Sequence, residues 1–75
     1  MEDTVREILG DILGIDKTAI NEKTSPQSVP GWDSLKHIEI VTSLEEEFDI
    51  VISIEDIESM VSFPDVIEKL KGYLE

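Results

Sequence analysis

Residues 31–37, Gly-Trp-Asp-Ser-Leu-Lys-His, bring a carboxylate, a hydroxyl and an imidazole together at the start of a predicted helix. Asp33 is a favourable N-cap, because its side chain can accept hydrogen bonds from the unpaired N–H groups of the first turn. Ser34 then takes the first helical position, where we expect its hydroxyl to face water. A helix N-terminus carries roughly +0.5 of an elementary charge and free N–H donors, so a phosphate on the Ser34 oxygen would lie in a favourable field.

The same residues raise the alternative of a hydrolase that uses Ser34, His37 and an acid. Ser34 and His37 lie one helical turn apart, but a triad also needs an acid that orients the imidazole and donors for an oxyanion hole. Asp33 is better explained as a cap, and 75 residues leave little room for a substrate cavity. We therefore predict no catalytic residue and interpret His37 as a surface residue beside Ser34.

A second motif follows ten residues after this serine. The predicted helix continues as Ile-Glu-Ile-Val over residues 38–41 and ends as Leu-Glu-Glu-Glu-Phe-Asp-Ile over residues 44–50. Asp-Ser-Leu alone starts many helices in which the serine has no further role. Together, the two motifs resemble the acyl carrier protein family, and the resemblance spans essentially the whole chain. It implies that Ser34 receives a 4′-phosphopantetheine arm from coenzyme A and that an acyl group is carried there as a thioester.

Three positions near Ser34 depart from the pattern of housekeeping fatty-acid carriers. Those carriers usually have an acid where Lys36 stands and commonly a methionine where Thr42 stands, and Trp32 resembles carriers of specialised pathways. We interpret the chain as a stand-alone carrier for fatty-acid, polyketide or specialised lipid synthesis. A carrier for an aminoacyl group and an unmodified acidic helical adaptor that binds basic proteins remain as alternatives.

The resemblance also implies partners and contact residues. The expected partners are a phosphopantetheinyl transferase and acyl-loading, synthase and acyltransferase enzymes with basic patches. The residues expected to contact them are Asp33, Leu35, Ile38, Glu39, Glu45, Glu46 and Glu55.

Composition narrows the remaining classes of function. The formal net charge of −12 disfavours nucleic acid and anionic membranes and favours basic protein partners. The absence of cysteine excludes disulfides and thiol chemistry, and the carboxylate clusters lack EF-hand spacing, so no specific metal site is predicted. Without a signal peptide or an apolar run of about 20 residues, we expect one monomeric carrier domain, residues 1–75, in the cytoplasm.

Apolar spacing predicts the first helix over residues 3–13, with a capping box between Thr4 and Glu7 and a left-handed end at Gly14. Gly10 either marks a close approach to another helix or is a tolerated defect. A long connection, residues 15–32, should be anchored by its apolar residues and by partial burial of Trp32.

The second helix is predicted over residues 34–48, with Ile40, Val41, Leu44 and Phe48 facing the core. The alternating residues 48–54 read as an extended loop, because no second strand is available to pair with them. Capping boxes at Ser53 and Ser62 start a short helix, residues 54–61, and a last helix with Val66, Ile67, Leu70 and Leu74 inward. The predicted fold class is all-α, a small bundle of three long helices and one short helix.

Overall fold

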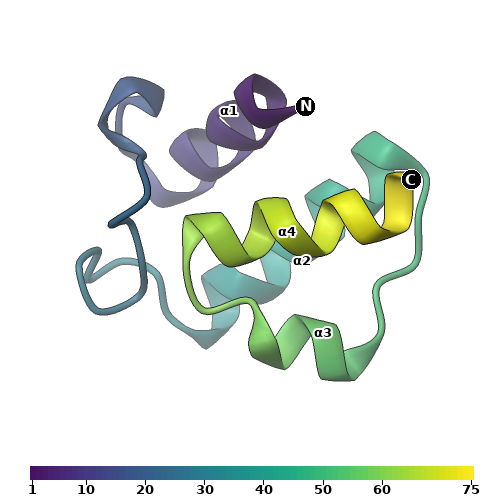
Figure 1. Cartoon of the computed structure of the whole chain (residues 1–75). Coiled ribbons are helices and arrows are strands. Elements are labelled where there is room, and N and C mark those ends of the chain that lie inside the picture. The colour runs from purple at the N-terminus through teal and green to yellow at the C-terminus, as the bar shows by residue number, and fades with distance from the viewer.

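The structure is a computed structural model that describes all 75 residues. Its elements are α1 (Glu2–Leu13), the 3₁₀ turn η1 (Lys17–Ala19), α2 (Ser34–Phe48), α3 (Ile54–Ser59) and α4 (Phe63–Leu74). Figure 1 shows α4 crossing in front of α2, the short α3 at the lower edge, and the long α1–α2 connection along one side. The all-α prediction of three long helices and one short helix is confirmed. None of these helices has both the length and the apolar character needed to cross a bilayer.

The first helix begins earlier than predicted. Its N-cap is Met1, and no side chain caps its start, so the predicted box between Thr4 and Glu7 is wrong. Glu2 and Asp3 occupy the first turn, where the helix dipole favours acidic side chains. The helix therefore begins at Glu2, on the N-terminal side of Thr4. The left-handed end at Gly14 is confirmed, with a φ of 73°.

The second helix has the predicted bounds, and its start and end both have a local cause. Asp33 caps its first turn through a hydrogen bond from the Lys36 amide. Asp49 ends it in the left-handed region with a φ of 54°, which aspartate tolerates better than most residues. Ile40, Val41 and Leu44 are buried and Phe48 is half-buried, so the predicted inward face is confirmed.

The core lies between α1, α2 and α4, and residues from the α1–α2 and α2–α3 connections complete it. Thirteen apolar residues are buried in one cluster. They are Val5, Leu9, Ile20, Trp32, Ile40, Val41, Leu44, Ile52, Met60, Phe63, Val66, Ile67 and Leu70. The extended loop was also predicted correctly, since residues 50–53 form no strand and bury Ile52.

The last two helices follow their predicted caps, but the short helix ends at Ser59 rather than at the predicted residue 61, and two further differences concern side chains. Ser53 and Ser62 each accept a hydrogen bond from the amide three residues later. The acids of these boxes bond elsewhere, however: Asp56 accepts from the Tyr73 hydroxyl and Asp65 from the Val61 amide. Leu74 was predicted to face inward but is 43% exposed, because it lies in the final residues of the chain, at the end of α4.

Candidate functional site

Ser34 is exposed at the first position of α2. The Oδ1 atom of Asp33 accepts a hydrogen bond of 2.9 Å from the Lys36 amide, and the Asp33 carbonyl accepts one of 2.9 Å from the His37 amide. The amides of Ser34 and Leu35 precede these and have no partner within the helix. The hydroxyl therefore lies at the positive end of a capped helix, where an enzyme in solution can reach it.

The connection before Ser34 is ordered by its own hydrogen bonds. The Thr24 carbonyl accepts a 2.8 Å bond from the Phe63 amide, which joins the connection to the start of α4. The Ser28 hydroxyl accepts from the Ser25 amide and donates to the Lys23 carbonyl. These bonds end at a turn in which the Trp32 amide donates to the Val29 carbonyl. The turn fixes the direction in which the chain enters α2.

Trp32 anchors this connection more firmly than the sequence indicates. Partial burial was predicted, but the side chain is only 3% exposed and belongs to the core cluster. A buried indole needs an acceptor for its N–H, and Trp32 Nε1 donates to His37 Nδ1 at 3.0 Å. The two ring planes lie 29° apart, with ring centroids separated by 6.0 Å.

His37 has a different place from the predicted one. It is half-buried rather than a free surface residue, and its Nε2 lies 2.8 Å from the carbonyl oxygen of Ile57 in α3. Both ring nitrogens are thus occupied by groups other than Ser34. The imidazole is not placed to take a proton from the Ser34 hydroxyl, and Asp33 is used as a cap. These contacts do not form a catalytic triad.

A groove of about 500 Å³ opens beside Ser34. Its lining includes Ser34, His37 and Ile38 of α2, Ile57 of α3 and Val61 just after α3. The groove thus lies where the connection before α2, the start of α2 and α3 meet, and Ser34 is one of the residues that line it. The groove therefore offers an apolar surface next to the Ser34 hydroxyl.

The residues predicted to contact partners fall into two groups. Those that remain available at the surface are Asp33, Leu35, Ile38, Glu39, Glu46 and Glu55. Leu35 and Ile38 are 68% and 54% exposed, and Glu39 pairs with Lys36 at 3.4 Å. Glu45 is half-buried, and its carboxylate accepts a 2.8 Å hydrogen bond from the Ile52 amide. Its carboxylate therefore holds the connection after α2.

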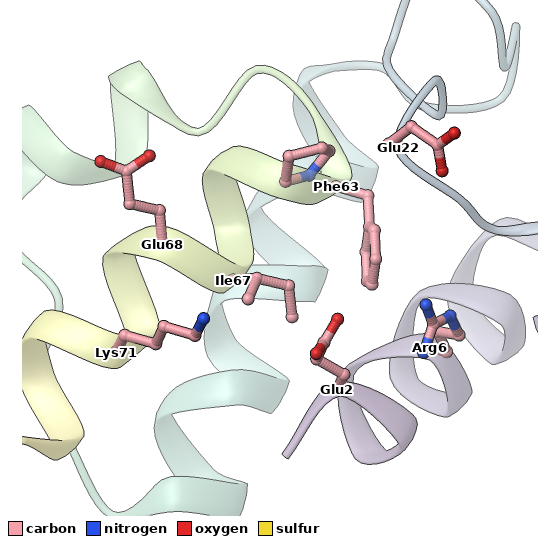
Figure 2. Close-up of a pocket in the computed structure, with 8 residues that line it drawn as sticks. Glu2, Arg6, Glu22, Phe63, Ile67, Glu68 and Lys71 are labelled. Atoms are coloured by element: carbon pink, nitrogen blue, oxygen red, sulfur yellow. The ribbon is translucent and has the colours of Figure 1, made fainter.

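A second pocket, of about 390 Å³, lies between the start of α1 and α4 and is separate from this groove. Figure 2 shows Arg6 beside Phe63, with Glu2 and Glu22 nearby and Lys71 further along α4. The Arg6 guanidinium lies 4.9 Å from the centroid of the Phe63 ring, and its Nε donates to the Ile20 carbonyl. Arg6 is therefore engaged in joining α1 to its neighbours. The chain also holds no group of three or more His, Asp or Glu side chains arranged to bind a metal.

Comparison with known proteins agrees with this geometry. The family described as "Phosphopantetheine attachment site" matches residues 3–70 of the chain. The acyl carrier protein of Clostridium acetobutylicum is 41% identical over 71 residues, which cover 95% of this chain and 92% of that protein. The chain belongs to the acyl carrier protein family. Among solved structures, a candidate acyl carrier protein from Mycobacterium tuberculosis superposes with a TM-score of 0.86 and 30% identity, over 96% of each chain.

Membership of the acyl carrier protein family defines the general role of the chain. Proteins of this family carry acyl groups on phosphopantetheine and serve synthase and transferase enzymes. The exposed helix start and the groove beside it are the features of this carrier that suit that role. The bridge from Trp32 through His37 to Ile57 was not predicted. The signal in the sequence was a single tryptophan in need of an acceptor, with a histidine five residues later.

Proposed function

We propose that Ser34 is the residue that receives the 4′-phosphopantetheine arm. The observation that carries the proposal is its exposed position at the capped N-terminus of α2, within the matched family region. The phosphate of the arm would lie next to the free amides of the first turn and the positive end of the helix dipole. Its thiol would supply the nucleophile that a chain without cysteine lacks. The chain itself holds and presents the cargo and leaves the chemistry to its partners.

The proposed carrier works in a specialised pathway as a stand-alone domain. Lys36 and Thr42, the positions that differ from housekeeping carriers, both lie on α2, and Thr42 is exposed. They would alter the surface that general fatty-acid enzymes meet while leaving Ser34 accessible. The proposed route handles a modified fatty acid, a polyketide or a lipid that is being decorated. The monomeric state and the cytoplasmic location stay predictions from the sequence.

Partner enzymes are proposed to dock at the start of α2 and along α3. Leu35 and Ile38 supply exposed apolar contacts next to Ser34, and Asp33, Glu39, Glu46 and Glu55 surround them with negative charge. Rim charges of this kind speed the encounter with a basic patch and allow easy release. The expected partners are the phosphopantetheinyl transferase and acyl-loading, synthase and acyltransferase enzymes.

The attachment site can be tested by mass spectrometry. The purified chain is incubated with coenzyme A and a phosphopantetheinyl transferase, and we expect the mass of one arm to be added. Ser34→Ala should abolish the gain, whereas the control Ser43→Ala, on the same helix, should keep it. A wild-type chain that gains no mass would support the unmodified adaptor, and a gain that persists in Ser34→Ala would place the arm elsewhere.

The class of cargo can be tested on the carrier purified from its own cells. Intact-mass and fragment spectra of the arm identify the thioester. An acyl cargo agrees with the proposal, whereas an aminoacyl cargo would support the alternative carrier.

A further inference from the structure

The hydrogen bonds of His37 fix the state of its imidazole. The indole of Trp32 has only a donor, and it points at Nδ1 from 3.0 Å. The Ile57 carbonyl has only acceptor capacity, and it lies 2.8 Å from Nε2. Both bonds exist together only if Nδ1 carries no proton and Nε2 carries one. The two contacts thus correspond to the tautomer with its proton on Nε2.

This imidazole joins the residue before the cap of α2 to α3, which lies 20 residues further along the chain than His37. Trp32 belongs to the connection before α2, His37 to the first turns of α2, and Ile57 to α3. The third segment most needs such a bond, because α3 has only six residues and none of them is fully buried. A helix this short is not stable alone. Its other polar tie to the bundle runs from Asp56 to Tyr73 and Lys69, on α4.

The residues of the bridge also line the groove beside Ser34. His37 and Ile57, the two residues joined by the 2.8 Å contact, are both among its lining residues. Met60, 1% exposed, forms part of its lining and packs into the core directly after α3. The imidazole is therefore a direct polar contact between α2 and α3 beside the groove.

We infer that His37 is a positioning residue that holds α3 against α2 and so limits how far the groove at Ser34 opens to the apolar part of an acyl cargo. The inference rests on the proposed attachment at Ser34 for its functional consequence only. With the bridge intact, the cargo lies on the groove and its thioester stays accessible. Without the bridge, α3 separates more readily and the acyl chain enters between the helices.

Two substitutions at His37 distinguish the effect of its hydrogen bonds from the effect of its ring volume. In His37→Gln the amide oxygen can accept from Trp32 and the amide nitrogen can donate to Ile57, so both roles are kept. In His37→Phe a ring of similar size remains, but both bonds are lost. Trp32→Phe removes the donor and leaves a smaller ring in the core, and it provides a second variant if His37→Phe does not fold.

The first test uses NMR on the unmodified chain. The nitrogen shifts of the wild-type His37 ring should report the tautomer protonated on Nε2. Losing one hydrogen bond raises an opening equilibrium roughly threefold to tenfold, so amide exchange in α3 should accelerate by about that factor in His37→Phe and remain near wild type in His37→Gln. A ring protonated on Nδ1, or equal exchange in all three proteins, would overturn the inference.

The second test uses carrier loaded with a medium-chain acyl thioester and measures cleavage by hydroxylamine. Wild type and His37→Gln should be cleaved at similar rates, and His37→Phe several-fold more slowly, because its acyl chain is sheltered. Equal rates in the three proteins would overturn the gating role. If no arm can be loaded, attachment at Ser34 fails instead, while the NMR result still decides the position of His37.

Discussion

At the scale of single residues, three consecutive residues of the site have three different structural roles. Asp33 caps the helix, Ser34 presents its hydroxyl to solvent, and Trp32 is turned into the core. The cap and the exposed serine were predictable because both follow from local rules of helix initiation. The burial of Trp32 was underestimated because its partner, His37, lies one and a half turns further on and bonds to a third segment.

The Tyr73 hydroxyl forms a second link of this kind. It accepts from the Ser53 amide at 2.9 Å and donates to Asp56 at 2.6 Å. That hydrogen bond, helped by the charge of Lys69, lowers the pKa of Asp56 below its usual value. Because the pKa is lower in the folded state than in the unfolded one, the resulting stability is present above the unfolded pKa, about 4, and is lost as the pH falls through the folded pKa.

We therefore expect Tyr73→Phe to lower the melting temperature at neutral pH and to differ less from wild type as the pH falls below about 4. A remaining difference is expected at acid pH, since the acceptor for the Ser53 amide is also lost. Melting curves across this range measure the effect. Asp56→Asn, which removes the titrating charge, is the control, and in that background Tyr73→Phe should show no such narrowing. If the difference in melting temperature between the wild type and Tyr73→Phe did not change with pH, the result would contradict the link between this hydrogen bond and the lowered pKa of Asp56.

At the scale of elements, the bounds of α2 were predicted well and the start of α1 was not. Apolar spacing, the cap and the acidic run all indicate one helix over Ser34–Phe48. At the N-terminus, the capping-box pattern at Thr4 competes with two acids that extend the helix, and the extension prevails. The extended loop was predictable because a lone strand has no partner, whereas the bond from the Ile52 amide to Glu45 depends on how that loop folds back.

Two glycines in helices should respond oppositely to alanine. A Cβ at Gly10 would lie 2.8 Å from the Ile15 carbonyl oxygen, a backbone atom that cannot move aside freely. The close approach is thus to the turn after α1, rather than to another helix. At Gly72 in α4 a Cβ would meet nothing within 4 Å.

We expect Gly72→Ala to raise the free energy of unfolding by roughly 0.5–1 kcal/mol, through helix propensity alone. Gly10→Ala gains the same propensity but must displace backbone, so it should destabilise the fold. Urea unfolding of both variants provides the comparison. Stabilisation by both would mean that the turn at Ile15 adjusts without cost.

At the scale of the whole molecule, charge is the dominant feature. The sequence has eighteen acidic residues and only six lysines and arginines, and nine of the acidic residues lie in the range Asp33 to Glu58. The four ion pairs lie at the surface, where each contributes about 0–1 kcal/mol. Self-repulsion across the molecule therefore outweighs pairing.

Salt should accordingly raise the melting temperature. Between about 0.01 M and 0.1 M salt the screening length falls from about 30 Å to about 10 Å. The second value is shorter than each dimension of the 28 × 22 × 19 Å molecule, whereas the first is not. Magnesium and sodium chlorides compared at equal ionic strength show whether screening alone is responsible. A melting temperature that does not change with salt would contradict the dominance of repulsion.

The chain has one tryptophan, and it stands two residues before Ser34, the serine proposed to receive the arm. Its indole is enclosed in the core and hydrogen-bonded to an imidazole, so its ultraviolet emission depends on the state of the turn that presents Ser34. The protein thus contains its own fluorescent reporter. Loading of the arm and docking of a partner enzyme can be followed optically in real time, without a dye.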